Sequence, residues 1–476
     1  MPQASNSTSD PTPLTTPIAK IPPEVWMRIF EDYVESYPEV RDQRVVDLCL
    51  VCKYWNNVAN DTPRLWTKIN LSFPFDNDLL DAMRKRIHAS RSQEIDVSID
   101  FRNPDPNWEG EEPDYDGDGV YGPTSESIWA REIRDLLVGT EKRWRSIKVV
   151  SSTWLPFYEL TKDWKFTHLP SLESVSMKRD NDMFGMEGVP YDPQTPDGPT
   201  ILFDGRGTLP KLRDLSLSAI PVDWNGGLNG CQNLRKIKIN NLPRDVAPSF
   251  EQFANFLSLS PRLEYLDVSG YCPWGHSLPP PPGAWDPPIP IVRLPMLKEF
   301  VFSWKVPENG CSFLEMFQIG NSLETLTLKD TESGSSHCRE PQGWPQSSEV
   351  IFNTLHELGS RDLLDEDDDT IPGPFISMRG VKRLKIMWTK ADRASLIPFL
   401  TTLTEVEDIL LEDVDEGVLE DVTSVQIERS RAMMGRPLRI DLRWMWQDEV
   451  PVFAEQCIQQ LEAAGIETTV HEVVED

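Results

Sequence analysis

The sequence predicts an α/β repeat protein in which a small all-helical N-terminal domain precedes a solenoid with a parallel sheet. Two observations support this fold class. Residues 18–71 contain short apolar helical patterns, and an apolar-x-x-apolar-x-apolar phrase recurs between residues 144 and 411. We therefore divide the chain into a polar tail at 1–17, a helical domain at 18–71, a repeat body at 72–446 and a terminal helix and strand at 447–476.

The first residues of the chain are rich in Ser, Thr and Pro. They lack both the basic segment and the apolar segment of a secretory signal, so we interpret them as a disordered tail. No apolar run approaches the roughly 18 residues that are needed to cross a bilayer. We therefore expect an intracellular chain, in the cytoplasm, the nucleus or both.

The chain is strongly acidic, with 77 Asp and Glu against 47 Lys and Arg and a net charge of −30. This charge repels the phosphates of nucleic acids and anionic lipid headgroups, which argues against both as partners. The acidic residues concentrate at 105–118, 362–369 and 405–421. We interpret these segments either as solvated loops or as surfaces that attract a basic protein.

Seven cysteines are scattered over the chain, and this odd number predicts no disulfide framework. Cys49 and Cys52 form a C-x-x-C pair, but no second pair and no nearby His completes a zinc site. Because the two residues lie in an apolar helical stretch, we interpret them as buried free thiols.

The first helix is expected to begin at Pro22 and Pro23, since proline suits the first helical turn and Glu24 complements the helix dipole. Two apolar rows then run side by side, with spacing i, i+4 and i+8. One row is Val25, Ile29 and Tyr33, and the other is Trp26, Phe30 and Val34. So short a helix can bury only one row in its own domain, so the other row should contact something else.

A second helix is expected over residues 44–59. Its apolar residues have the spacing of a single buried stripe, formed by Leu48, Cys52, Trp55 and Ala59. Pro63 follows soon after and ends the helical pattern, because the residue before a proline is excluded from the α region. An extended segment is expected from there to Leu71.

These residues resemble the F-box. The match begins with Ile21-Pro22-Pro23-Glu24-Val25 and Ile29-Phe30, continues through Leu48-Cys49-Leu50-Val51-Cys52-Lys53-Tyr54-Trp55, and closes with Asp61-Thr62-Pro63-Arg64-Leu65-Trp66. The last phrase is similar to the version common in F-box proteins of mushroom-forming fungi. Two features depart from the usual pattern: position 21 is Ile instead of Leu, and the connection from 37 to 44 is longer and more charged.

The resemblance implies that this domain binds a Skp-type adaptor, which joins it to a cullin–RING ubiquitin ligase. By position, the residues implied to make or support that contact are Ile21, Pro22, Pro23, Ile29, Val51, Cys52 and Trp55. For Ile29 and Trp55 the alternative is a purely structural role in a small helical core.

The repeat body is defined by phrases whose last two apolar positions would alternate on a short strand and point inward. Several of the intervals between phrases lie in the range of roughly 20–29 residues that is typical of leucine-rich repeats, and the others carry insertions. The phrases are Trp144/Ile147/Val149, Leu172/Val175/Met177, Leu212/Leu215/Leu217, Leu234/Ile237/Ile239, Leu263/Leu266/Val268, Leu297/Phe300/Phe302, Leu323/Leu326/Leu328, Val381/Leu384/Ile386 and Val406/Ile409/Leu411. A late strand is expected at Leu438/Ile440/Leu442.

Helical segments are expected between some of these phrases, at 131–138, 251–259 and 395–403, with a terminal helix at 452–463. A doubly wound α/β domain would also alternate strands with helices. No glycine-rich phosphate-binding turn follows any of the predicted strands, which disfavours that alternative.

Four tryptophans lie in predicted loops beside Pro or Gly: Trp224, Trp274, Trp285 and Trp344. Aromatic residues dominate binding hot spots, so these four are our candidates for client binding. The alternative is that they pack against the scaffold. The proline-rich segment at 279–290 is expected to form a stiff extended spacer.

No motif for catalysis, metal or cofactor binding is recognisable. The chain has no P-loop, G-x-S-x-G or H-E-x-x-H sequence, and its six histidines are dispersed. Asp114, Asp116 and Asp118 copy the first half of an EF-hand loop, but Ser125 stands where the bidentate Glu is required.

We therefore expect a non-enzymatic substrate adaptor of a Skp–cullin–F-box ligase that needs no cofactor and whose body holds a client protein. The alternatives are an interaction scaffold outside any ligase and an enzyme with catalytic groups from distant loops.

Overall fold

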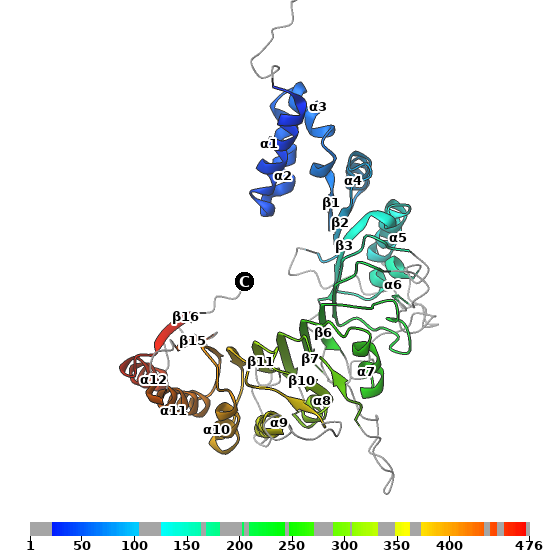
Figure 1. Ribbon diagram of the computed structural model, residues 1–476. Helices are drawn as coiled ribbons and strands as arrows, with labels where there is room; N and C mark the ends of the chain where they lie inside the picture. Colours follow the sequence, from blue (N-terminus) through cyan, green and yellow to red (C-terminus); the bar gives the residue numbers. More distant parts are fainter. Residues whose placement is uncertain are drawn as a thin grey trace, which may run out of the picture.

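The computed structural model describes residues 21–103, 125–162, 168–180, 202–203, 209–242, 247–270, 289–304, 307–331, 348–361, 373–432, 438–444 and 452–472. Figure 1 shows a small group of helices at the N-terminal end, followed by a long arc of strands and helices. None of the helices in these ranges is long and apolar enough to cross a membrane.

The N-terminal helical domain is built from three α-helices and two 3-10 turns. They are α1 (Pro23–Glu35), η2 (Pro38–Val40), α2 (Arg41–Val51), α3 (Lys53–Asn60) and η3 (Pro63–Trp66). The domain has a hydrophobic core of its own, distinct from that of the arc, which contains Phe30, Val34, Val45, Leu48, Val58, Ala59 and Leu65. Its helices can therefore pack without help from the repeat body.

The predicted single helix over 44–59 is wrong, because the chain breaks between α2 and α3. Cys52 is extended there, with φ −164° and ψ 165°, and its Sγ accepts a hydrogen bond from the Trp55 backbone N–H at 3.5 Å. Cys52 thus caps the N-terminus of α3 instead of continuing a buried stripe. Consequently Cys52 is exposed and Cys49 is half-buried, so the prediction of two buried thiols is also wrong.

The arc contains a 13-stranded sheet in which each strand pairs with its neighbours in parallel. Its spatial order follows the chain. The strands are β1 (Lys68–Ser72), β2 (Ile95–Asp100), β3 (Trp144–Ser151), β4 (Ser174–Arg179), β5 (Asp214–Ser218), β6 (Lys236–Leu242), β7 (Tyr265–Gly270), β9 (Glu299–Trp304), β11 (Thr325–Asp330), β13 (Arg383–Met387), β14 (Asp408–Glu412), β15 (Arg439–Trp444) and β16 (Glu467–Glu472). A 3-stranded sheet is formed by β8 (Val292–Arg293), β10 (Phe317–Ile319) and β12 (Phe375–Ile376).

The recurring apolar phrases coincide with these strands, and the pairing register aligns them. One buried ladder crosses the sheet through Ile69, Val97, Ile147, Val175, Leu215, Ile237, Leu266, Phe300, Leu326, Leu384, Ile409 and Ile440. Side chains alternate across a strand, so aligned apolar positions give the whole sheet one buried face. The predicted parallel sheet is confirmed.

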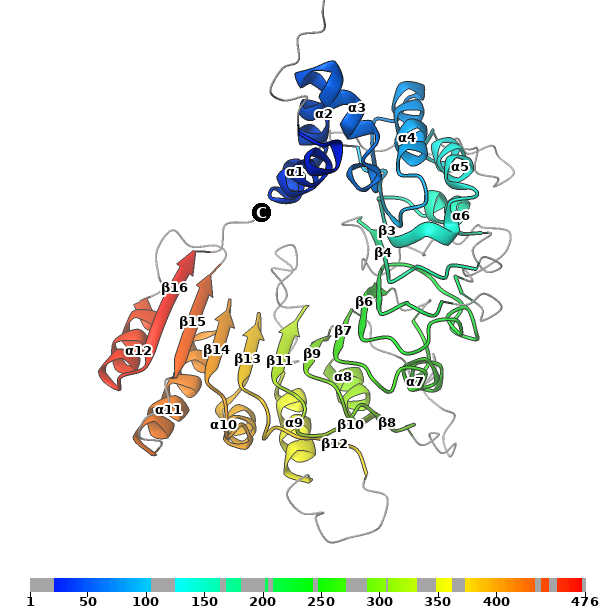
Figure 2. The same ribbon diagram turned by 45° about the horizontal axis from the view of Figure 1, so that its top comes forward.

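The buried face of the sheet is covered by helices on the outer side of the arc (Figures 1 and 2). They are α4 (Asn77–Ala89), α5 (Ser125–Leu137), α6 (Leu155–Thr161), α7 (Phe250–Ser258), α8 (Pro307–Leu314), α9 (Glu349–Arg361), α10 (Arg393–Thr402), α11 (Glu416–Ala432) and α12 (Val452–Ala463). Within the described part of the chain these helices lie on one face only, whereas a doubly wound domain covers both faces. The body is an α/β solenoid-like array.

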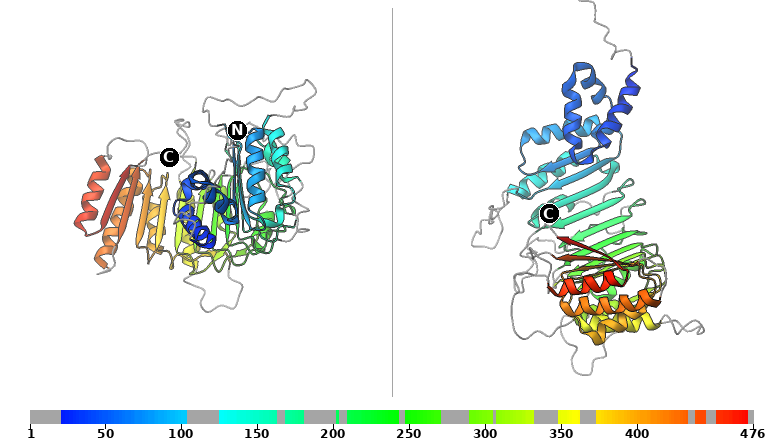
Figure 3. Two further views of the ribbon diagram at one scale, coloured as in Figure 1. Left: turned by 90° about the horizontal axis from the view of Figure 1, so that it is seen from above. Right: turned by 90° about the vertical axis from the view of Figure 1, so that its left-hand side faces the viewer.

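The inner side of the arc is formed by the strand residues that alternate with the buried ladder. We call this surface the concave face. Figure 3 shows α1–α3 at one end of the array and α11 and α12 at the other, with the strands between them. The chain therefore presents two separate surfaces, one on the helical domain and one along the arc.

Candidate functional site

Helix α1 buries one of its two apolar rows and exposes the other. Phe30 and Val34 are fully buried, whereas Val25, Ile29 and Tyr33 are 46%, 44% and 41% exposed. Such a row of apolar side chains costs solvation free energy unless a partner covers it. The expectation that one row stays free is confirmed, and the free row is the one that contains Ile29.

The buried row is held by a cluster of aromatic rings around Trp55. The ring centroids of Trp26 and Phe30 both lie 5.0 Å from that of Trp55, and 5.8 Å from each other. Tilted rings at these distances pack favourably. Trp55 is half-buried in this cluster. It therefore supports the exposed row indirectly, by fixing the position of α1.

The start of α1 is tied to α3 by one hydrogen bond. The Tyr54 hydroxyl donates to the backbone carbonyl of Ile21 at 3.4 Å. Ile21 is half-buried, while Pro22 and Pro23 are exposed on the first turn. Of the residues predicted to form this site, Pro22, Pro23, Ile29, Val51 and Cys52 are therefore accessible to a partner.

Helix α2 exposes two apolar residues, Val46 and Leu50, that were not predicted to belong to the site, beside Val51, which was. Val46 and Leu50, spaced i and i+4, are 48% and 76% exposed, and Val51 at the end of the helix is 58% exposed. In sequence they look like further members of an apolar helix with a buried side. Only their exposure in the folded domain distinguishes them from core residues.

The long, charged connection between α1 and α2 is ordered by Arg44. Its guanidinium lies 4.4 Å from the ring centroid of Tyr33 and 3.6 Å from that of Tyr37, and it donates a hydrogen bond to the Tyr33 carbonyl at 3.0 Å. These cation–π contacts hold the connection against the C-terminal end of α1. The unusual length of the connection therefore adds a folded turn, η2, beside the exposed row.

An ion pair joins the helical domain to the arc. Arg86 on α4 is 8% exposed, and its guanidinium lies 2.6 Å from the Asp42 carboxylate on α2. The Asn70 side-chain amide on β1 donates to the other oxygen of that carboxylate at 2.8 Å. Charge-assisted hydrogen bonds from both the first helix and the first strand of the arc thus fix the orientation of α2.

Of the four tryptophans predicted to bind a client, only Trp224 lies in the described part of the chain. Trp224 is half-buried and packs edge-on against Phe253 and Phe256, at 6.1 and 5.9 Å between ring centroids. This is the scaffold-packing alternative that the sequence left open. Trp274, Trp285 and Trp344 lie outside the described residues, as do nearly all of the proline-rich segment and the EF-hand-like residues 114–119.

The acidic segment at 405–421 is not a loop. It contains β14 and the first turns of α11, because Val406, Ile409 and Leu411 within it are buried. The other two acidic segments, 105–118 and 362–369, lie outside the described residues.

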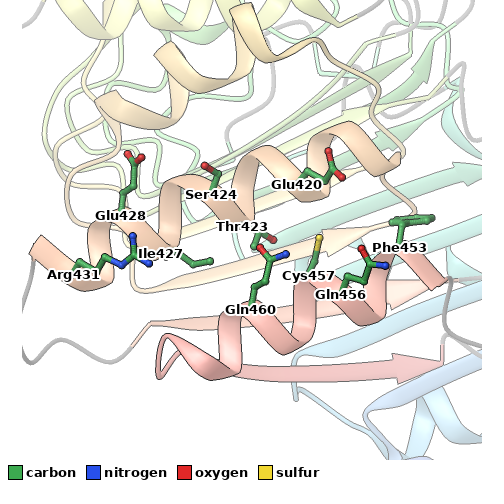
Figure 4. Close-up of a pocket in the computed structure, with 10 residues that line it drawn as sticks. All are labelled: Glu420, Thr423, Ser424, Ile427, Glu428, Arg431, Phe453, Gln456, Cys457 and Gln460. Carbon is green, nitrogen blue, oxygen red and sulfur yellow. The ribbon is translucent and has the colours of Figure 1, made fainter.

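A pocket of about 270 Å³ lies between α11 and α12 on the outer side of the arc (Figure 4). It is lined by Glu420, Thr423, Ser424, Ile427, Glu428, Arg431, Phe453, Gln456, Cys457 and Gln460. Burial raises the pKa of the Cys457 thiol, which keeps it protonated and weakly nucleophilic. The described residues also contain no group of His, Cys, Asp or Glu that could hold a metal ion.

The helix break at Cys52 makes a prediction for thiol chemistry. We expect iodoacetamide at pH 8 to alkylate Cys52 at least about tenfold faster than Cys49, Cys231 or Cys457, because access and thiolate content govern the rate. Cys52 is exposed, whereas burial raises the pKa of the other three thiols. Peptide mapping by mass spectrometry over a time course measures each site separately. Equal rates at Cys49 and Cys52 would indicate a continuous helix instead.

Comparison with known proteins identifies the helical domain but leaves the arc unassigned. Residues 18–72 match the family described as F-box-like. A comparison with curated proteins found no match to the chain. The matched residues include all of α1, α2 and α3, and thus both exposed apolar rows. The chain therefore contains an F-box-like domain at residues 18–72, followed by a solenoid-like α/β body.

Proposed function

We propose that this protein is the substrate-recognition adaptor of a Skp–cullin–F-box ubiquitin ligase. The F-box-like domain would bind a Skp-type adaptor, and the solenoid would hold a client protein. The observation that carries the proposal is the exposed apolar surface of α1 and α2, formed by Val25, Ile29, Val46 and Leu50, within the segment that matches the F-box family. No residue of this chain needs to perform chemistry in such a role.

The adaptor interface is favoured by the composition of that surface. Burying apolar area yields roughly 25 cal/mol per Å², and aliphatic side chains that project from a rigid helix lose little conformational entropy on binding. The aromatic cluster around Trp55 and the Arg44 contacts hold α1 and η2 in place before a partner arrives. The surface is therefore preorganised for docking.

The proposed mechanism is proximity, which requires the two binding surfaces to keep a defined orientation. The ion pair between Arg86 and Asp42 and the hydrogen bond from Asn70 support this requirement, because they fix the F-box-like domain to the first strand and helix of the arc. A client held on the arc would then have a high effective concentration at the ubiquitin-loaded enzyme.

We further propose that the body is an irregular leucine-rich-repeat array of an intracellular protein of fungal type, located in the cytoplasm, the nucleus or both. Phrases that align in one buried ladder support the repeat assignment. The five cysteines of the described ranges are free, which fits a reducing compartment.

The concave face is the surface that we propose for the client. Its strand positions carry about as many basic as acidic side chains, among them Lys148, Lys238, Lys329, Lys385, Arg443, Asp96, Asp267, Asp408, Glu412 and Asp441. The strong negative charge of the chain is thus not concentrated there. A client need not be basic to bind, and local complementarity should decide specificity.

Copurification with a recombinant Skp-type adaptor tests the proposal. The full-length chain should elute with the adaptor in size-exclusion chromatography, and the complex with a cullin–RING module should transfer ubiquitin to the chain itself or to an added client. Adaptor binding without any cullin-dependent transfer would favour the alternative scaffold function. Absence of adaptor binding would reject the proposal.

A further inference from the structure

The residue at the end of several strands adopts a left-handed backbone conformation. Immediately after β5 and β14 this residue is Ala219 or Asp413, with φ of 54° and 45°, and within β6 it is Asn241, with φ of 53°. Small or turn-prone residues tolerate this conformation best. After β13, however, the residue is Trp388, with φ of 55°. A bulky side chain at such a position is a local conflict, and conflicts of this kind concentrate at functional sites.

Trp388 lies at the concave face beneath a lysine. The Lys329 Nζ on β11 is 3.6 Å from the centroid of the Trp388 ring, a close cation–π contact. The indole Nε1 of Trp388 is buried and has no hydrogen-bond partner among the described residues. Burial lowers the pKa of Lys329, so its ammonium is partly dehydrated as well. Both groups are hydrogen-bond donors, and neither has a hydrogen-bond acceptor among the described residues.

Glu412 on the next strand is a complementary group. It lies in the same row of the concave face as Lys329, with Met387 of β13 between them in the pairing register. Its side chain is 8% exposed and forms no hydrogen bond or ion pair with a described residue, although the Trp388 backbone N–H donates to the Glu412 backbone carbonyl at 2.8 Å. Burial raises the pKa of this carboxyl, ahead of the opposing effect of the Lys329 charge. Glu412 is therefore an acceptor that needs a donor.

These three groups do not stabilise the fold in the way that the rest of the sheet does. A buried carboxylate and a buried indole N–H without partners each carry a desolvation penalty. An apolar residue at either position would avoid it. The most direct reason to keep two donors and one acceptor, adjacent and unsatisfied, is that a ligand satisfies them.

We propose that an extended segment of a client polypeptide docks across β11, β13 and β14 (Figure 2), a proposal that rests on the client-binding role of the concave face. A peptide main chain offers the required groups at short spacing: its carbonyls accept from Lys329 Nζ, and from Trp388 Nε1 when the indole shifts to expose that atom, and its N–H donates to Glu412. The half-exposed Met387 packs against the segment between them. Side chains of the client that point away from the sheet do not contact this site, so they do not affect binding here.

A synthetic array of unmodified 12-residue peptides of random sequence tests the site, with the full-length chain in complex with its adaptor as the probe. The variants are Trp388→Ala, Glu412→Gln and the control Lys148→Ala, which removes an exposed lysine from β3 on the same face. Peptides that the wild type retains should bind at least about tenfold more weakly to the first two variants and equally to the control. Equal binding to all of them, or no peptide retained above the level of Trp388→Ala, would overturn the proposal.

Two further measurements separate this proposal from a structural role and from the proposed function. Glu412→Gln should raise the melting temperature, because it removes an unpaired buried charge at constant shape. A structural role would lower it and would overturn the proposal. Adaptor binding of all three variants, measured by coelution, should equal that of the wild type. If the wild-type chain failed to bind the adaptor, the ligase function would fail, while the array probed with the chain alone would still report on the peptide site.

Discussion

Replacing Ile29 by Asp should weaken binding of a Skp-type adaptor by at least about 100-fold, which corresponds to about 2.7 kcal/mol. Ile29 is in the middle of the exposed row of α1, between Val25 and Tyr33. A carboxylate there would lose its hydration when the partner covers it, without gaining an opposite charge from an apolar interface. The chain should still fold, because the side chain is 44% exposed and belongs to neither hydrophobic core.

Ile128→Asp is the matched control for this experiment. Ile128 on α5 is 47% exposed and lies outside the segment that matches the F-box family. The same chemical change should leave adaptor affinity within about twofold of the wild type. Isothermal titration calorimetry of both variants against the recombinant adaptor gives the comparison. Equal affinities for the two variants would mean that the exposed row of α1 is not the docking surface.

Replacing Phe302 by Ala should destabilise the arc by about 3–5 kcal/mol, the usual cost of removing a buried aromatic side chain. Phe302 on β9 is fully buried, and its ring centroid lies 5.4 Å from that of Phe313 and 5.5 Å from that of Trp304. Gly310 packs closely over it, since a Cβ added there would lie 3.1 Å from the Phe302 ring. Because these side chains are tightly packed, they can move little to fill the cavity that the Phe302→Ala substitution leaves.

Because Phe302 lies in the middle of the array, its replacement should also change the shape of the unfolding transition. Each repeat contacts only its neighbours, so a cavity in the middle should divide the cooperative unfolding of the arc into separate transitions. Denaturant unfolding followed by circular dichroism measures this, with Val138→Ala as a control at a 64% exposed site that should change stability by less than about 0.5 kcal/mol. Adaptor binding should survive, because the F-box-like domain has its own core. Loss of adaptor binding in Phe302→Ala would show that the two cores are coupled.

Most strands of the large sheet were predictable because their signal is local and repeated, although β2 was not predicted. Leu215 and Leu217 on β5 follow the same alternation as Ile237 and Ile239 on β6, and the alternation specifies which face is buried. Helices α9 and α11 were not predicted, although each is longer than the predicted α7 and α10. They lie where the distance between phrases is variable, so their sequences looked like insertions in a repeat instead of members of it.

The candidate site was predictable in part, and the errors in that prediction have one physical origin. The rows of Ile29 and Phe30 are equally apolar in sequence, and only packing against Trp55 selects the row that is buried. The same limit applies to Leu50, which is 76% exposed beside the buried Leu48. Cys52 has the spacing of a helical core residue, yet its extended backbone and its hydrogen bond to Trp55 make it a cap.

The sequence by itself determined the order of the parts, the F-box-like segment, and the register that makes a parallel sheet of separated phrases. These features depend on residues that are close in the chain or on a pattern that repeats, so they can be read without knowing the fold. The tertiary structure alone decided which apolar rows face solvent, how Arg86 and Asp42 join the two parts, and that Lys329, Trp388 and Glu412 meet on one face. Each of these depends on contacts between distant segments, and exposure is a property of the packed molecule rather than of any residue in it.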